Sequence, residues 1–437
     1  MHYRVGGYMN VARKKGICRT SCYLVAAFSS GVSSMSTTAT HTGVRVDTAM
    51  MKPTLRGVVF DMDGTLTVPN LGFEEMYRRC GVPLDQDILQ AVQEMDEADA
   101  ARAHRVIEEM EHEGRQTLQL MPGAAELGQW LTHHQLPMAL VTRNTNRTVE
   151  AFCSQLWPPH MPFSLTISRD GGHTAKPDPA ALHHIAKHWS IDLPTKSLLM
   201  VGDSPSNDVV FGKAAGVSTV LLNTGSKYSD SRPSIEQADM NIPYLWELPR
   251  ILCRQFIVDG PLGTNQPLIK YPPPPPPTTK ACQAARNGSV EIIQECSPQM
   301  LNEPDESGNT PLIWAADANQ MKVVEALLSI QDIDVDIQGY LGATALCRAS
   351  RRGHAEILQL LLQKGKSNPD ISNIKMQYPL HFAAFKKHPQ TVHILLENGA
   401  NPLVLDRKGR TPDQDTSDPK IRDMIIQFRN NKFNLTT

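Results

Sequence analysis

The stretch Val58-Val-Phe-Asp-Met-Asp-Gly-Thr-Leu-Thr67 carries the strongest structural signal in this sequence. An apolar run of strand length, Gly57–Phe60, is followed directly by two carboxylates, Asp61 and Asp63. Ligand chemistry in open parallel sheets collects at the carboxyl ends of the strands. An Asp-x-Asp pair is common on protein surfaces, but between a buried strand and Gly-Thr it indicates a functional site.

Similar short apolar runs recur on the carboxyl side of this stretch and alternate with helical patterns through residues 55–258. Each run is short enough to be a strand that is buried on both faces. They are Met138–Val141, Leu198–Val201 and Thr219–Leu222. The alternation predicts an α/β domain with a Rossmann-like parallel sheet wrapped by helices.

Residues 69–116 depart from this alternation, because their apolar residues recur at helical spacing. We therefore predict a small helical cap inserted between the first two strands. The stripes are Phe73, Met76, Tyr77 and Cys80; Ile88, Val92 and Met95; and Ala103, Val106, Ile107 and Met110. From Pro69 to Arg115 there are 12 acidic and 5 basic residues. This excess would disfavour a strongly anionic substrate if it faced the site, but the favoured interpretation places it on the solvated side of the helices.

Residues 259–278 form a predicted proline-rich linker, with an unbroken run of prolines at Pro272–Pro277. Polyproline lacks donors for a sheet or helix and is a stiff, extended spacer. A ligand for an aromatic groove on another protein is the alternative interpretation of the same run.

A repeat follows over residues 279–430 and predicts an all-α solenoid. Its anchors are Thr310-Pro-Leu, Thr344-Ala-Leu, Tyr378-Pro-Leu-His and Thr411-Pro, at intervals of 34, 34 and 33 residues. This period is typical of ankyrin repeats. Each anchor precedes a helical pattern, such as Val323–Leu328, Ile357–Leu362 and Val392–Leu396. An incomplete repeat at Ala281–Ile293 and a polar one after Thr411 are expected to cap the array.

The first half of the chain resembles the haloacid dehalogenase superfamily and its phosphoglycolate phosphatase-like branch. Besides Asp61 and Asp63, the motifs arrive in that family's order: Thr142 after Met138–Val141, Lys176 in Ala-Lys-Pro-Asp-Pro, and Asp203 and Asp208 in Gly-Asp-Ser-Pro-Ser-Asn-Asp. The resemblance implies a phosphatase that works through an aspartyl-phosphate.

In this interpretation Asp61 attacks phosphorus, and Mg²⁺ neutralises the repulsion between the two anions. The metal set would be the Asp61 carboxylate, the Asp63 carbonyl and Asp203, with Asp208 positioning the ligands. Asp63 would act as general acid and base, which distinguishes phosphatases from dehalogenases of the family. Thr142 and Lys176 would bind the transferring phosphoryl oxygens.

Other residues in the same region allow weaker interpretations. Arg143 and Asn144 follow Thr142 and are candidates for substrate contact, but a solvent-facing Arg143 is the favoured interpretation. His184 and His188 are spaced to place two ligands on one helix face, but an amphipathic surface is favoured. A phosphonate-cleaving variant would need a cap lysine for an imine, and the sequence has none between Pro69 and Gln116.

Two functions remain open beside the phosphatase: an inactive ankyrin scaffold whose catalytic half has decayed, and a sugar phosphomutase. The expected substrate is a phosphorylated small molecule or a phosphoprotein, and the repeats are expected to bind a protein partner. With 43 basic and 45 acidic residues, the net charge of −2 gives no field for a nucleic acid. A membrane is also not an expected partner, because no apolar run reaches the length of a span.

The first 50 residues resemble an organelle transit peptide. They are rich in Arg, Lys, Ser and Thr and contain no acidic residue before Asp47. We expect import into a mitochondrion or plastid, or otherwise a cytoplasmic protein. A disordered tail, or translation that starts at Met50 or Met51, are the alternatives. The scattered cysteines lack a C-x-x-C pair and favour a reducing compartment.

Overall fold

The computed structural model describes residues 52–435, except residue 87 and the ranges 225–236 and 259–272. The segment 1–50 and the first part of the predicted linker therefore lie outside the described residues. Within the described part of the linker, Pro273–Pro277 has neither helix nor strand. None of the described helices combines the length and the apolar character needed to cross a membrane.

Six parallel strands form the sheet of the first half, in the order β3-β2-β1-β4-β5-β6. Val59 of the central strand β1 lies opposite Ala139 on one side and Met200 on the other. The strands are β1 (Gly57–Phe60), β2 (Met138–Val141), β3 (Leu165–Ile167), β4 (Leu198–Gly202), β5 (Ser218–Leu222) and β6 (Met240–Ile242). The Rossmann-like prediction is confirmed, and its four strands correspond to β1, β2, β4 and β5.

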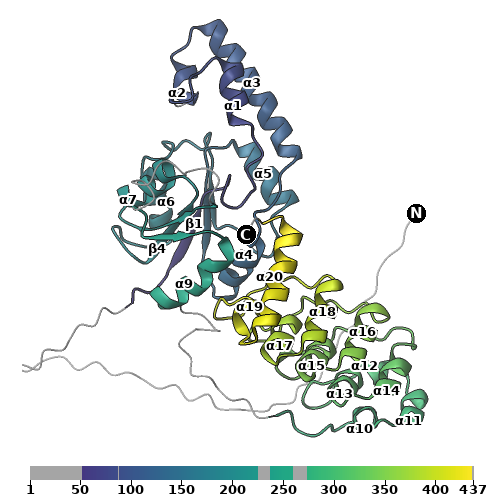
Figure 1. The fold of residues 1–437 in the computed structure, drawn as a ribbon. Coiled ribbons are helices and arrows are strands. Elements are labelled where there is room, and N and C mark those ends of the chain that lie inside the picture. Colours follow the sequence, from purple (N-terminus) through teal and green to yellow (C-terminus); the bar gives the residue numbers. More distant parts are fainter. Residues whose placement is uncertain (1–51, 87, 225–236, 259–272, 436–437) are drawn as a thin grey trace, which may run out of the picture. The chain divides into compact units, whose positions relative to one another are not determined.

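Helices cover both faces of this sheet, as Figure 1 shows. Side chains alternate along a strand, so Val58 and Phe60 pack against α4 (Ala124–His133), α5 (Asn146–Gln155) and α9 (Leu248–Gln255). Val59 points to the other face and packs with α6 (Ala180–His188) and α7 (Val210–Ala214). All three strand residues are at most 1% exposed, which explains why β1 is apolar throughout.

The predicted cap is present as α1 (Phe73–Cys80), α2 (Ile88–Gln93) and α3 (Glu97–Gln116). Its own small core contains Met76, Val92 and Ile107, one from each helix. Asp96 begins α3 by accepting a hydrogen bond from the Asp99 amide at 2.9 Å. Phe73 lies on the predicted helix, but it is 42% exposed and lines the cavity described below.

Two chain segments connect the cap to the sheet domain side by side. The Val68 amide donates to the Gln119 carbonyl at 2.9 Å, and the Met121 amide donates to the Leu66 carbonyl at 2.8 Å. The Asn70 side chain adds a bond to the Gly114 carbonyl at 2.6 Å. These bonds join the residues that leave β1 to those that return toward α4.

The second half of the chain consists of helices in stacked pairs, and the ankyrin prediction is confirmed. The predicted helical patterns lie within or largely within α14, α16 and α18, and the anchors precede α13, α15, α17 and α19. The helices are α10 (Lys280–Asn287), α11 (Val290–Glu295), α12 (Pro298–Asn302), α13 (Pro311–Asp317), α14 (Met321–Leu327), α15 (Ala345–Arg352), α16 (Ala355–Gln363), α17 (Pro379–Phe385), α18 (Pro389–Glu397), α19 (Pro412–Asp415) and α20 (Pro419–Phe433).

The anchor threonines act as helix N-caps. Thr310 accepts a hydrogen bond from the Ile313 amide at 3.4 Å, and Thr344 accepts one from the Cys347 amide at 3.2 Å. At Thr411, the backbone amide donates to the Gln414 side-chain oxygen at 3.4 Å. Tyr378 makes no such bond, so the repeat that departs from threonine lacks a stabilisation of about 1 kcal/mol.

Candidate active site

Three of the predicted site residues follow neighbouring strands at one edge of the sheet. Asp61 follows β1, Thr142 follows β2 and Asp203 follows β4. The Asp61 amide donates to the Val201 carbonyl at 2.9 Å, and the Thr142 amide donates to the Ile167 carbonyl at 2.9 Å. Backbone hydrogen bonds of the kind found in a parallel sheet thus fix both residues, although each lies one residue beyond the end of its strand. The chain continues from β1 to β2 on one side and from β4 to β5 on the other. The site thus lies where the strand order reverses, which is the usual ligand position in this type of sheet.

The loop after β1 passes in direct contact with Asp203. Gly64 has a φ of +79°, a conformation that L side chains rarely adopt. A Cβ atom at Gly64 would also overlap the Asp203 carboxylate. Hydrogen bonds from the Gly64 amide to the Thr67 carbonyl (2.9 Å) and from the Leu66 amide to the Met62 carbonyl (2.8 Å) close this loop. Gly64 is therefore needed for a tight turn against the Asp203 carboxylate.

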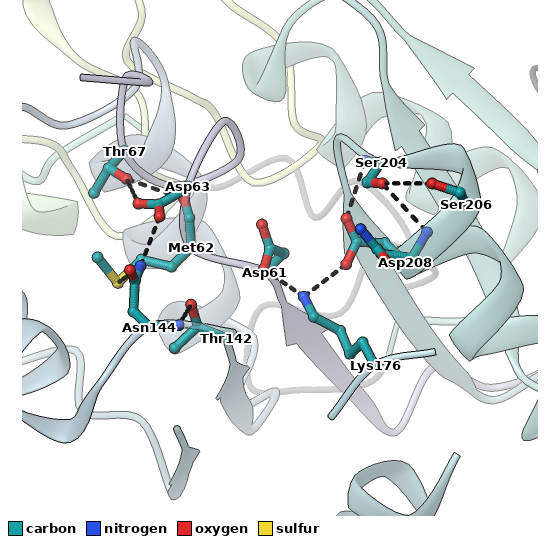
Figure 2. A network of polar contacts seen from close by, with 11 residues as sticks. Asp61, Met62, Asp63, Thr67, Thr142, Asn144, Lys176, Ser204, Ser206 and Asp208 are labelled. Carbon is teal, nitrogen blue, oxygen red and sulfur yellow. Dashed lines mark hydrogen bonds and ion pairs between the residues drawn. The ribbon is translucent and has the colours of Figure 1, made fainter. Parts of the chain in front are cut away.

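Lys176 lies between two of the site's carboxylates (Figure 2). Its ammonium donates to Asp61 Oδ1 and to Asp208 Oδ1, the latter at 2.7 Å. Asp208 belongs to the short helix η1 (Pro205–Val209), and its other oxygen accepts a hydrogen bond from the Ser204 amide at 3.0 Å. The ammonium is thus fixed from two sides.

Electrostatics at this pair follow from burial and from the neighbouring charges. Burial raises the pKa of Asp61 well above its usual value; Lys176 opposes this shift, and Asp208 and Asp203 add to it. Burial alone would lower the pKa of Lys176, but the Asp208 and Asp61 carboxylates outweigh it and raise that pKa above its usual value. The lysine therefore stays charged. Its single positive charge does not offset the effect of burial and of the neighbouring carboxylates on the pKa of Asp61.

The three carboxylates Asp61, Asp203 and Asp208 present oxygen atoms within 4.8 Å of one another, and all three residues are buried. Lys176 supplies one positive charge against their three negative charges. A buried excess of this size is costly unless a cation is held there. Carboxylate oxygens are also the ligands that Mg²⁺ prefers. Both the donor set and the charge therefore fit a divalent cation, with Asp208 as a further candidate ligand beside its predicted positioning role.

Asp63 is held in place from the side away from Asp61 (Figure 2). Thr67 Oγ1 donates to one of its oxygens at 3.1 Å, and Asn144 Nδ2 donates to the other at 2.6 Å. Thr142 Oγ1 accepts a hydrogen bond from the Asn144 amide at 3.1 Å, which leaves the hydroxyl hydrogen available to another acceptor. Asn144 was a candidate for substrate contact, and its side chain instead donates a hydrogen bond to Asp63.

These residues line a cavity of about 500 Å³ between the carboxyl ends of the strands and the cap. The site side contributes Asp61, Asp63, Thr142, Arg143, Asn144, Arg169, Lys176, Asp203, Ser204, Ser206, Asn207 and Asp208. The cap side contributes Pro69, Leu71, Phe73, Met76, Tyr77, Leu84, Ile88, Leu89, Ile107 and Glu111. Arg143 therefore lies at the cavity. Of the acidic cap residues that the structure describes, Glu111 alone lines it, so the acidic excess faces elsewhere, as predicted.

Sequence reasoning missed an ion pair that joins the cap to the site. Arg169 Nη1 lies 3.0 Å from Glu111 Oε1, and the Arg169 amide donates to the Asn144 carbonyl at 2.8 Å. Arg169 follows the edge strand β3, so prediction of that strand would have placed it at the site. His184 and His188 lie exposed on α6, away from the carboxylates.

A Rossmann-like parallel sheet with an aspartate pair directly after its central strand β1, and a helical cap inserted after that strand, is the arrangement of a capped Rossmann-like hydrolase. The sequence pattern of haloacid dehalogenase-like hydrolases matches residues 55–216, and ankyrin repeats match residues 268–339 and 332–406. A haloacid dehalogenase-like hydrolase domain-containing protein of Arabidopsis thaliana is 33% identical over 222 residues, 48% of this chain and 88% of the relative.

Two further relatives match the same half of the chain. An uncharacterised hydrolase of Saccharomyces cerevisiae is 33% identical over 172 residues, 38% of this chain and 77% of the relative. A phosphoglycolate phosphatase of Pseudomonas fluorescens is 31% identical over 207 residues, 42% of this chain and 74% of the relative. The chain belongs to the haloacid dehalogenase-like hydrolase family and carries ankyrin repeats in its second half.

Proposed function

We propose that this protein is a Mg²⁺-dependent phosphomonoesterase that forms an aspartyl-phosphate on Asp61. The observation that carries the proposal is the convergence of Asp61, Asp203, Asp208 and one buried lysine at the end of the central strands. Asp63 and Thr142 line the same cavity. Phosphoglycolate phosphatase activity, as named for the Pseudomonas relative, supports the reaction class.

In the first half of the reaction, a carboxylate oxygen of Asp61 attacks phosphorus in line with the departing alcohol. The bond between phosphorus and the alcohol oxygen breaks, and Asp63 gives that oxygen a proton. The Thr142 hydroxyl and the Lys176 ammonium donate to the transferring oxygens, where negative charge is spread. Mg²⁺ held by the Asp61 and Asp203 carboxylates and the Asp63 backbone carbonyl, with Asp208 positioning these ligands or joining them, would supply the positive charge that lets two anions approach.

In the second half, Asp63 is a carboxylate, because it has given up its proton. It takes a proton from a water molecule as that water attacks the phosphorus of the aspartyl-phosphate. The bond between phosphorus and Asp61 breaks, and inorganic phosphate leaves. Thr67 and Asn144 donate hydrogen bonds to the two oxygens of Asp63. The same carboxyl group is thereby held in position for both proton transfers.

Divalent-metal removal is the direct test. We expect the full-length protein to release inorganic phosphate from phenyl phosphate in the presence of Mg²⁺. EDTA should slow this release by at least about 100-fold, because the buried carboxylates then repel the phosphate. Added Mg²⁺ should restore it. An unchanged rate in EDTA would contradict metal dependence. Sugar phosphate that isomerises without free phosphate would indicate the phosphomutase instead.

For the second half we propose protein binding through the ankyrin repeats, which would bring the phosphatase to a partner protein. The partner either carries the phosphorylated group or positions the enzyme near another substrate. The opposing interpretation, an inactive scaffold, is disfavoured because every residue of the catalytic motif is present and the residues converge in one cavity.

For residues 1–50 we propose a role in targeting to a mitochondrion or plastid, supported by their basic, hydroxyl-rich composition. We expect residues 1–50 fused to a fluorescent reporter to label one organelle. The same reporter fused to residues 51–100 serves as the control. A diffuse signal from both fusions would overturn the targeting proposal.

A further inference from the structure

The cap side of the catalytic cavity is almost entirely apolar. Nine of its ten lining residues are aliphatic, aromatic, methionine or proline, and the tenth is Glu111. Some of these residues belong to the cap's own core: Met76, Ile88 and Ile107 are at most 8% exposed and pack against one another's helices. Packing within the cap explains why these three residues are apolar. Evidence for a ligand must therefore come from the other cap residues that line the cavity.

Two lining residues are exposed to an extent that the cap's own packing does not explain. Leu84 is 66% exposed and Phe73 is 42% exposed. Leu84 is the most exposed large apolar side chain among the residues that the structure describes. Tyr77 and Leu89, both partly buried, lie at the same cavity. Large apolar side chains that collect at a cavity opposite polar, catalytic groups are typical of a ligand site.

The distribution of charge in the cavity indicates what that ligand lacks. Among its described residues, the cap contributes no Lys, Arg or His to the cavity. On the opposite side, Lys176 is bonded to Asp61 and Asp208, and Arg169 is paired with Glu111 at 3.0 Å. Arg143 also lines the cavity there, beside the catalytic groups and not on the cap. A carboxylate on a leaving group that lies against the cap would thus meet apolar side chains and Glu111, where it would lose hydration without gaining a partner from the cap.

We propose that the substrate is a small phosphomonoester whose leaving alcohol is uncharged and largely apolar, with Leu84 and Phe73 as specificity-determining residues. The phosphate lies at Asp61, Thr142 and Lys176, and the apolar part of the alcohol covers the exposed cap side chains. This inference rests on the proposed phosphatase activity. It separates this protein from its phosphoglycolate phosphatase relatives, because phosphoglycolate carries a carboxylate on a short leaving group.

The test compares two esters with equal intrinsic reactivity. Hexyl phosphate and its analogue with a terminal carboxylate have the same chain length and the same kind of alkoxide leaving group. With full-length protein and Mg²⁺, we expect kcat/KM for hexyl phosphate to exceed that for the carboxylated ester by at least about 10-fold, because apolar burial favours one and an unpaired charge penalises the other. A preference for the carboxylated ester, or equal values, would overturn the inference.

Substitutions in the cap test whether Leu84 and Phe73 cause the preference for hexyl phosphate. Leu84→Lys and Phe73→Lys should each lower kcat/KM for hexyl phosphate and raise it for the carboxylated ester, which shifts the ratio by about 10-fold or more. Met300→Lys is the matched control, because Met300 is 48% exposed but lies in the ankyrin half, outside the cavity. A ratio that Leu84→Lys and Phe73→Lys leave unchanged would also overturn the inference. Failure to hydrolyse any ester, phenyl phosphate included, would instead overturn the proposed phosphatase itself.

Discussion

Asp61→Asn is expected to reduce phosphate release by about 10⁴-fold or more, because an amide of the same shape cannot attack phosphorus. The same substitution should leave the metal-free protein at least as stable as the wild type. Asp61 is buried beside Asp203 and Asp208, and its negative charge is opposed by burial and by both carboxylates. Lys176 keeps Asp208 as a partner at 2.7 Å when Asp61 is neutral.

Two measurements check this expectation: the turnover number with phenyl phosphate, and thermal unfolding in EDTA. Asp178→Asn is the matched control, since Asp178 is an exposed carboxylate two residues beyond Lys176. It accepts a hydrogen bond from the Ala180 amide at 2.9 Å, which asparagine can also accept. The control should retain full activity. Residual turnover above a few per cent in Asp61→Asn would remove Asp61 as the nucleophile.

Lys176→Met is expected to destabilise the metal-free protein by about 3–5 kcal/mol, because it leaves buried carboxylates without their cation. The Lys176 side chain is only 3% exposed and is bonded to both Asp61 and Asp208. Mg²⁺ should restore part of this free energy of unfolding, since it would supply positive charge to the same oxygens. Activity should fall about 100-fold or more even with Mg²⁺, because one donor to the transferring phosphoryl group is lost.

Urea unfolding of the variant and the wild type, with EDTA and with Mg²⁺, measures the stability change. Lys213→Met provides the comparison, because Lys213 pairs with Asp239 at 2.6 Å while its side chain is 39% exposed. An exposed pair of this kind contributes only about 0–1 kcal/mol. If both substitutions had equally small effects, Lys176 would not be the counter-ion of the carboxylate site.

The central strands could be predicted from sequence because both of their faces are buried. Val58, Val59 and Phe60 are apolar without interruption, since helices cover each side of β1. The edge strands β3 and β6 were missed for the opposite reason. Each has three residues, and the middle one, Thr166 or Asn241, is exposed and polar. Such a segment has no continuous apolar run and resembles a loop.

The predicted phosphate and metal residues could be identified because each follows a recognisable strand or stands in a short motif. The orienting bond from Asn144 to Asp63 could not be predicted, since it depends on how the loop after β2 turns. The pair formed by Glu111 and Arg169 was also beyond sequence reasoning. It joins residues 58 positions apart, one on α3 and one behind β3, and no local pattern connects them.

The close passage of the loop after β1 over Asp203 has a consequence for how this site can diversify. A Cβ atom at Gly64 would overlap Asp203, and a Cβ atom at Gly202 would overlap Asp208. Gly64 thus fits the loop after β1 against the loop after β4, and Gly202 lets the loop after β4 turn back onto its own Asp208. Recombination between relatives that exchanged one loop alone would bring together backbones that had not been fitted to each other. We therefore expect a chimeric enzyme to keep its activity only if residues 61–67 and 202–208 come from the same parent, although more than a hundred residues separate them.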